Sequence, residues 1–175
     1  VHVQEYSEGK PQNDVHVVGK TDITGTTITF QPDETIFETL IYKYDILAHR
    51  MQELAFLNSG LKLSLTDERE KGEDGNFKRQ DFYSEGGLSE FVQYLDEGKP
   101  DLIDRPIYVK GKEDNVEVEV AMQYNTTYSE NIYSFVNNIN TREGGTHVNG
   151  FRRAVNRLFT KYGEENGFFK KLKFK

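Results

Sequence analysis

The sequence predicts an α+β fold in which helices pack on a β-sheet. Two observations indicate this class. Short segments of alternating or β-branched apolar residues recur along the chain, as in Leu61–Leu65 and Val116–Tyr124. Between them lie segments whose apolar residues return every three or four positions, which is the period of an amphipathic helix. The order is strands, a long helix, strands, a short helix, strands and a final helix, which favours a single domain over residues 1–175.

The first 30 residues are expected to form short strands separated by polar turns. Val1–Tyr6 and Val15–Val18 are extended segments on either side of a turn that contains Gly, Pro and Asn. A second polar break precedes Thr26–Phe30, whose β-branched residues favour a strand. We therefore expect three strands before the first helix.

A long amphipathic helix is expected next. Thr35–Glu38 has the form of a capping box, and Asn58–Gly60 is a stop signal. The opposite face of this helix carries charged residues, Arg50 among them, and is predicted to be solvated. The apolar positions at helical spacing are Phe37, Leu40, Ile41, Tyr44, Leu47, Ala48, Met51, Leu54 and Ala55.

One hairpin and a short helix follow in the prediction. Leu61–Leu65 and Phe77–Tyr83 are expected to pair around a charged surface loop at 67–76. A short helix is expected from Leu88 to Leu95. Two further strands are predicted, at Ile107–Val109 and Val116–Tyr124.

The C-terminal part is predicted to contain one more helix. Ile132–Val136 fits either a strand or a brief helical turn. Alternation from Lys171 onward indicates the start of another strand. The apolar stripe of the helix consists of Val148, Phe151, Val155, Leu158 and Tyr162.

Composition excludes several classes of protein. The chain has no Cys, so disulfides, thiol catalysis and thiolate metal sites are excluded. No apolar run approaches the length of a transmembrane helix, so we expect no membrane partner, and the absence of Cys agrees with the cytoplasmic location that we expect. The net charge of −7 argues against a general nucleic-acid coat protein but permits a local basic patch. Because Val1 is not Met, we expect the chain to be part of a longer protein.

Most candidate catalytic and metal-binding residues have simpler interpretations. His2, His16 and His49 have no second His or carboxylate at a zinc-type spacing on the same element, so we interpret them as structural and predict no metal site. The acids Asp67 and Glu68 lie beside Arg69. They form either a catalytic pair or an ion cluster at the end of a strand, and we favour the ion cluster.

The motif that precedes the last helix allows two interpretations. Glu143–His147 reads EGGTH, and two glycines before a helix expose backbone N–H groups that favour an anion. The alternative is a Gly-Gly turn into the helix, with Thr146 as the N-cap. The spacing matches neither a P-loop nor a dinucleotide fingerprint.

A row of basic residues follows on the last helix. Arg153, Arg157 and Lys161 recur at four-residue steps, and Arg152 lies beside them. No acid occurs between Thr146 and Tyr162. Such a row can bind phosphate backbones without reading a base sequence. It can equally be a solvated face whose cations pair with acids elsewhere in this acidic chain.

Several motifs closely resemble the B subunits of bacterial DNA gyrase. Phe135–His147 reads FVNNINTREGGTH and continues into Gly150–Arg152, as it does in that family. Further stretches agree in order over nearly the whole chain; they are Gly25–Asp33, Arg50–Asn58, Asp67–Arg69 and Tyr83–Leu88.

The resemblance implies the transducer, the second domain of the ATPase region. Its fold is similar to domain 2 of ribosomal protein S5, with helices on one face of a mixed β-sheet and a left-handed βαβ crossover. An upstream domain would hold ATP and Mg²⁺, and strands in residues 1–20 would link from it. The last strand and a Gln-Thr-Lys loop that reaches ATP are expected after residue 175. The resemblance therefore implies no catalytic, cofactor-binding or metal-binding residue in this chain, which alone is expected to be inactive.

The family is an ATP-dependent topoisomerase, an isomerase that supercoils DNA negatively. The implied partners are the transported DNA segment, the gyrase A subunit and a second B subunit. Arg152 matches the family motif, so the resemblance strengthens Arg152, Arg153, Arg157 and Lys161 as candidates to line the DNA cavity. For Gly144, Gly145, Thr146 and His147 it implies packing rather than chemistry.

Two alternatives remain open at this point. Val148–Gly150 reads VNG, which favours the related subunit of topoisomerase IV, whereas Ser134–Thr141 is more like gyrase. The second alternative is a stand-alone nucleic-acid-binding module of the S5-like fold, against which the charge of −7 counts.

Overall fold

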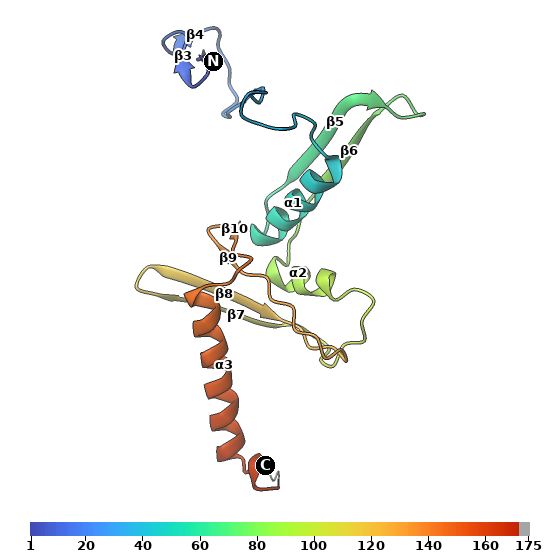
Figure 1. Ribbon diagram of the computed structural model, residues 1–175, viewed down its shortest axis with the longest axis vertical. Helices are drawn as coiled ribbons and strands as arrows, with labels where there is room; N and C mark the ends of the chain where they lie inside the picture. The colour runs from blue at the N-terminus through green and yellow to red at the C-terminus, as the bar shows by residue number, and fades with distance from the viewer. Residues whose placement is uncertain (172–175) are drawn as a thin grey trace. The chain divides into compact units, whose positions relative to one another are not determined.

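The computed structural model describes residues 1–171, and the side chains of residues 1–169 (Figure 1). Backbone contacts divide the chain into two compact units, one from Val1 to Tyr44 and one from Asp45 onward. The expectation of a single domain over residues 1–175 stays a prediction. The strand expected from Lys171 onward lies outside the described residues, apart from its first residue, which belongs to a 3-10 turn.

The first unit contains four very short strands. β1 (His2–Val3) pairs with β4 (His16–Val17), and β2 (Tyr6–Ser7) pairs with β3 (Lys10–Pro11), both antiparallel. The expected strand at Thr26–Phe30 does not form. Ile28 is 80% exposed and Phe30 72% exposed. An isolated extended segment has no partner for its backbone groups, and β-branched side chains do not replace that partner.

The expected helix start at Thr35 is also wrong. Asp33 closes a single turn there, because its carboxylate accepts from the Thr35 backbone N–H at 2.8 Å and its carbonyl accepts from Phe37 at 3.0 Å. Thr39 then accepts the Ile41 backbone N–H through its hydroxyl oxygen at 3.3 Å. These local side-chain bonds compete with helical ones, and the helix begins only at Tyr44.

The second unit follows the predicted order more closely. Its helices are α1 (Tyr44–Leu57), α2 (Leu88–Leu95) and α3 (Thr146–Glu165), followed by a 3-10 turn, η1 (Phe168–Lys171). Its strands are β5 (Leu63–Lys71), β6 (Phe77–Phe82), β7 (Ile107–Glu113), β8 (Val116–Met122), β9 (Phe135–Val136) and β10 (Ile139–Asn140).

Neighbouring strands pair as hairpins. The pairs β5–β6, β7–β8 and β9–β10 are all antiparallel. β5 runs past Asp67 to Lys71 with an irregular register, so the charged loop expected at 67–76 is shorter than predicted. Within residues 1–171 we find separate two-stranded antiparallel sheets instead of one mixed sheet.

The core of the second unit is aromatic. Phe56 of α1 stacks on Phe91 of α2 with ring centroids 5.0 Å apart and an interplanar angle of 14°. Phe91 also lies 6.3 Å from the ring of Phe135 in β9. The buried hydrophobic residues of the described chain are Ala55, Phe56, Phe82 and Phe91. α1, α2 and the β9–β10 hairpin therefore meet at one small core.

Candidate functional site

The β9–β10 hairpin turns through two asparagines. Asn137 and Asn138 have positive φ angles of 48° and 66°, and Val136 faces Ile139 across the ladder. Positive φ at both central residues is the geometry of a type I′ turn, which asparagine tolerates better than other residues with a Cβ. The sequence thus places a tight tip between the two strands.

This hairpin is bonded to α1 and to Asn58, the residue that follows the helix. The Arg50 guanidinium donates to the Asn138 carbonyl at 2.6 Å. The side-chain amide of Asn138 donates to Asn58 Oδ1 at 3.0 Å, and that of Asn140 donates to Glu53 Oε1 at 3.3 Å. Three hydrogen bonds therefore join segments that are 80 or more residues apart in the sequence.

Glu53, which accepts one of these bonds, is a buried charged residue. The residue is only 7% exposed, and its second carboxylate oxygen forms an ion pair with Arg50 one turn earlier. A buried carboxylate is unfavourable unless it is paired and hydrogen-bonded, and here it is both. Sequence reasoning missed this pair and predicted Arg50 on a solvated face. The available signal was an opposite-charge pair at i,i+3 beside the apolar positions Leu54 and Ala55.

The open end of the hairpin is closed by two hydroxyl residues. The Thr141 backbone N–H donates to the Ser134 carbonyl at 2.8 Å, and the Thr141 hydroxyl donates to the same carbonyl at 3.0 Å. The Ser134 hydroxyl donates in return to the Thr141 carbonyl at 3.0 Å. These bonds extend the hairpin beyond its two-residue strands.

The glycine motif links this closed end to α3. The Thr141 hydroxyl oxygen lies 3.1 Å from Nε2 of His147 in the first turn of the helix. A Cβ at Gly145 would lie 2.9 Å from the imidazole, so a residue with a Cβ would require the ring to move. Gly144 has φ +76°, a left-handed conformation that favours glycine. The predicted N-cap was wrong: the helix includes Thr146, Gly145 is the N-cap, and no side chain caps it.

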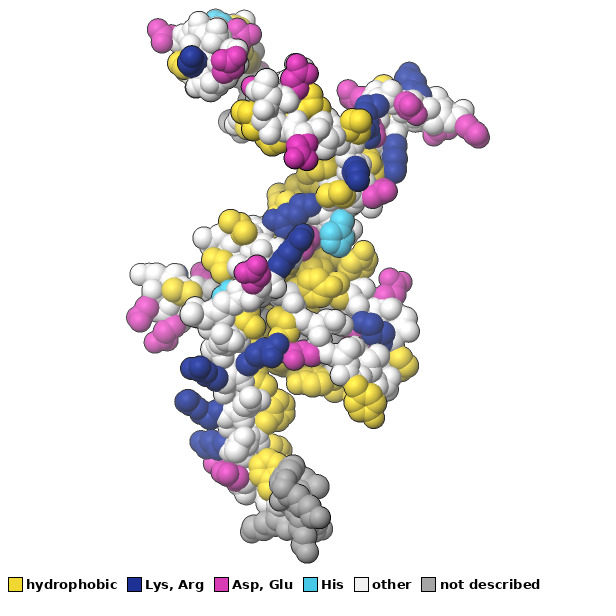
Figure 2. Space-filling model, in the orientation of Figure 1, with side chains coloured by type: hydrophobic (Ala, Val, Ile, Leu, Met, Phe, Trp, Pro, Cys, Tyr) yellow, Lys and Arg dark blue, Asp and Glu magenta, His cyan; other side chains and the backbone are white. Residues whose placement is uncertain are grey.

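The four basic candidates all lie on α3 and are exposed. Arg152 forms an ion pair with Glu130 at 2.9 Å, and Lys161 lies 3.8 Å from Glu165 on the next turn. Arg153 and Arg157 have no ion pair with the rest of residues 1–171. Figure 2 shows Lys and Arg side chains in a column along one side of this helix, with hydrophobic side chains on the other. The helix can thus offer a row of cations to a polyanion.

Asp67 and Arg69 form an ion pair in β5. The guanidinium donates to both carboxylate oxygens, at 2.8 Å and 2.5 Å. The hydrogen bond from Arg69 lowers the pKa of Asp67 from 3.8 to about 2. A carboxylate held this acidic is a poor proton acceptor at neutral pH, so the geometry favours the ion-cluster interpretation over the catalytic pair.

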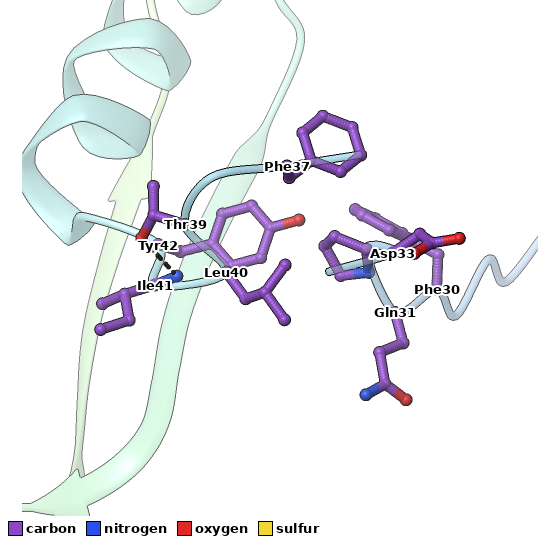
Figure 3. A pocket seen from close by; sticks show the side chains of 9 residues that line it. Phe30, Gln31, Asp33, Phe37, Thr39, Leu40, Ile41 and Tyr42 are labelled. Atoms are coloured by element: carbon purple, nitrogen blue, oxygen red, sulfur yellow. Dashed lines mark hydrogen bonds between the residues drawn. The ribbon is translucent and has the colours of Figure 1, made fainter. Parts of the chain in front are cut away.

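A hollow of about 360 Å³ lies in the first unit. Figure 3 shows Leu40 and Tyr42 on one side of it and Phe30 and Asp33 on the other. Its lining contains no Lys or Arg to receive phosphate groups. Nowhere in residues 1–171 do three or more His, Cys, Asp or Glu residues gather as metal ligands would. These residues do not fit ATP with Mg²⁺.

None of the helices within the described residues is both long enough and apolar enough to cross a membrane.

The comparisons with known proteins agree on one family. The family profile described as DNA gyrase B matches residues 87–175. The DNA gyrase B protein of Eisenibacter elegans is 51% identical over 173 residues, which are 99% of this chain and 36% of that protein. That of Chitinophaga japonensis is 52% identical over 97% of this chain and 36% of its own length. The chain thus spans about a third of the length of these relatives.

Solved structures of gyrase B proteins are also similar to this chain. The crystal structure of the 43K ATPase domain of Thermus thermophilus gyrase B, in complex with an aminocoumarin, is similar with a TM-score of 0.78 and 33% identity. The similarity covers 95% of this chain and 44% of that one. The B subunit of the DNA gyrase from Myxococcus xanthus has a TM-score of 0.75 and 26% identity, over 93% of this chain and 47% of its own.

Proposed function

Since this chain belongs to the DNA gyrase B family, we propose that it contains the transducer of a gyrase B protein. In this role it couples ATP binding and hydrolysis in the adjacent ATPase domain to movement of the DNA gate and to negative supercoiling. The parent is an ATP-dependent isomerase of the cytoplasm that uses ATP and Mg²⁺. Its partners are DNA, the gyrase A subunit and a second B subunit.

One observation carries this proposal. The β9–β10 hairpin is bonded to α1 by Arg50 at its tip and by Glu53 at Asn140, and to α3 by His147 at its closed end. A coupling module needs a physical connection between the part that senses nucleotide and the part that meets DNA. The hairpin supplies such a connection between two helices that have no direct backbone contact within the described chain.

The DNA-facing part is the basic row of α3. Arg153 and Arg157 are exposed and have no ion pair among the described residues, so phosphate groups need not displace an acid to reach them. Arg152 and Lys161 meet their acids on the surface, where an ion pair contributes only about 0–1 kcal/mol. The row thus suits a non-specific contact with a transported DNA segment.

The ATP chemistry belongs elsewhere in the parent protein. The described residues do not fit ATP with Mg²⁺, so we expect the isolated chain neither to bind nor to hydrolyse ATP. The S5-like mixed sheet with its left-handed crossover is likewise part of the proposal. It requires additional strands beside the β5–β6 and β7–β8 hairpins, whose outer edges are unpaired within residues 1–171.

Charge reversal in the full-length protein, assembled with its A partner, tests the proposal. Arg153→Glu with Arg157→Glu is expected to reduce the rate of DNA supercoiling by about tenfold or more, since four units of charge change at the DNA-facing row. Basal ATP turnover without DNA should be retained.

Lys110→Glu with Lys112→Glu on β7 is the matched control, because it changes the net charge equally on another exposed surface. Supercoiling at the normal rate in the α3 variant, or an equal loss in the β7 variant, would remove the DNA role from α3.

One specific observation keeps a second candidate, the same domain of topoisomerase IV: Val148–Gly150 in the first turns of α3. The assembled enzyme separates the two candidates. Net negative supercoiling of relaxed DNA supports gyrase, and relaxation or decatenation without supercoiling supports topoisomerase IV. A stand-alone nucleic-acid-binding module predicts instead that the isolated chain binds DNA with a steep salt dependence.

A further inference from the structure

Glu53 is a buried carboxylate in a chain that buries few polar residues. Among the described residues only Glu53 and Ser84 are buried polar or charged residues. Removing a carboxylate from water is costly, and the cost is met only while each oxygen has a partner. One partner, Arg50, comes from the same helix, but the other, Asn140, comes from the hairpin.

Arg50 also connects α1 to the hairpin, but as a hydrogen-bond donor, whereas Glu53 is an acceptor. One guanidinium nitrogen faces Glu53, and another donates to the carbonyl of Asn138 at the hairpin tip. The planar guanidinium presents several N–H groups in a fixed fork, so fixing one nitrogen on Glu53 orients the other toward the tip. The buried carboxylate thereby aims a surface cation at a single backbone oxygen.

The attachment of the hairpin to α1 is polar. Its apolar contact is instead with α2, through the ring of Phe135 near Phe91. One aromatic contact permits several arrangements, whereas the hydrogen bonds of Asn138 and Asn140 to Arg50, Glu53 and Asn58 restrict both the position and the rotation of the hairpin. Without the polar bonds the hairpin remains attached but is free to slide or turn on the aromatic core.

We propose that Glu53 and Arg50 are positioning residues that hold the β9–β10 hairpin in the one register from which Thr141 can bond His147 and so fix the start of α3. This inference rests on the proposed coupling function and assigns the residues that carry it. Neither Glu53 nor Arg50 is proposed to contact nucleotide or DNA. They act through the hairpin.

The test uses the full-length protein assembled with its A partner, and its readout is the ratio of ATP turnover with and without linear DNA. Asn140→Ala removes the bond from the hairpin to Glu53 and leaves the ion pair within α1 intact. Glu53→Gln keeps the shape of the side chain but removes the charge. Each is expected to lower the DNA-stimulation ratio by about three- to tenfold, with basal turnover within about twofold of normal.

A charge exchange separates positioning from helix stability. Arg50→Glu with Glu53→Arg restores an opposite-charge pair at the same spacing, but the glutamate has no N–H to donate to the Asn138 carbonyl. We expect its unfolding temperature to recover relative to either single variant while the DNA-stimulation ratio stays low. Recovery of the ratio in the exchanged variant would overturn the positioning role.

The matched control is Asp81→Asn, an acid-to-amide change at an exposed ion pair on β6. It should leave the ratio unchanged. A normal ratio in both Asn140→Ala and Glu53→Gln would overturn the inference while leaving the coupling proposal intact, provided that reversal of Arg153 and Arg157 still slows supercoiling. If that reversal has no effect either, the coupling proposal itself fails.

Discussion

Nε2 of His147 lies 3.1 Å from the hydroxyl oxygen of Thr141, the residue that closes the β9–β10 hairpin. This single contact joins the first turn of α3 to a hairpin whose other end is bonded to α1. The Gly-Gly pair before the helix makes the contact sterically possible, because a Cβ at Gly145 would meet the imidazole at 2.9 Å. In this structure the motif thus connects the hairpin to α3, and Gly145 leaves space for the imidazole.

We predict that Gly145→Ala destabilises the chain. The added methyl group displaces the imidazole, with loss of the bond to Thr141, and the expected cost in free energy of unfolding is about 0.5–1.5 kcal/mol. Gly150→Ala, a turn further into α3, is the matched control, since nothing lies within 4 Å of its added Cβ. It should stabilise the chain by up to about 1 kcal/mol through helix propensity. Urea unfolding monitored by circular dichroism measures both.

Destabilisation by Gly145→Ala together with stabilisation by Gly150→Ala would support a contact between the added methyl group and the imidazole. If the imidazole is the group displaced, Gly145→Ala should cost much less in a His147→Ala background, so the two changes are non-additive. Additive effects, or a stabilising Gly145→Ala, would show that the ring does not occupy the position described.

A second prediction concerns Glu130, which pairs with Arg152 at 2.9 Å. Both side chains are more than half exposed, so the pair is weak and DNA competes with it for the guanidinium. Glu130→Gln should therefore increase the affinity of the full-length protein for duplex DNA, about two- to fivefold at low salt. Arg152→Gln should weaken binding and reduce the salt slope by about one.

Fluorescence anisotropy across a salt series measures these affinities. Glu117→Gln on β8 is the control, since it breaks another exposed ion pair, that with Lys112, and changes the net charge equally. Equal gains in affinity from the Glu117 and Glu130 variants would mean that only total charge matters.

Sequence patterns predicted those elements that local interactions determine. α2 is observed over the expected Leu88–Leu95, and α3 contains the expected apolar stripe and all four basic candidates. β6 and β8 also lie within the strands expected at Phe77–Tyr83 and Val116–Tyr124. Ile132–Val136, which fitted either strand or helical turn, contributes Phe135 and Val136 to β9. In each case the pattern of residues within one segment predicts the element that this segment forms.

The features that were missed depend on partners far away in the sequence. Thr26–Phe30 has strand propensity but pairs with no strand of residues 1–171, and the turn closed by Asp33 replaces the first part of the long helix. Hydrogen bonds join Arg50 to Asn138 and Glu53 to Asn140, which lie 88 and 87 positions later in the sequence. No hydrophobic periodicity indicates such contacts. Their residue types are visible in the sequence, but their neighbours are not.

A third prediction concerns the aromatic core. Phe91 is 5% exposed and contacts the rings of Phe56, Tyr133 and Phe135. Phe91→Ala should lower the free energy of unfolding by about 3–5 kcal/mol, because transfer energy is lost and a cavity remains. Phe30→Ala, at a residue 72% exposed, should change it by less than about 1 kcal/mol. Similar losses in both variants, measured by urea unfolding, would contradict a core centred on Phe91.

The last prediction concerns protonation of Asp67. The hydrogen bond from Arg69 lowers the pKa of this carboxyl from 3.8 to about 2. A depressed folded-state pKa means that the ion pair contributes fully above the ordinary value and that its contribution is lost as the pH falls from about 4 toward 2. Carboxyl carbon NMR should therefore give a titration midpoint near 2 for Asp67. In Arg69→Gln the midpoint should return toward the ordinary value.

Asp74 provides the internal control for this titration. The pKa of its carboxyl is lowered by the backbone N–H and side-chain amide of Asn76, so it should not respond to Arg69→Gln. An Asp67 midpoint that stays near 2 in the variant would assign the shift to another cation, such as Lys78, whose charge acts in the same direction. Movement of both midpoints together would indicate that the β5–β6 hairpin had rearranged, since only the hairpin is common to the two carboxyl groups.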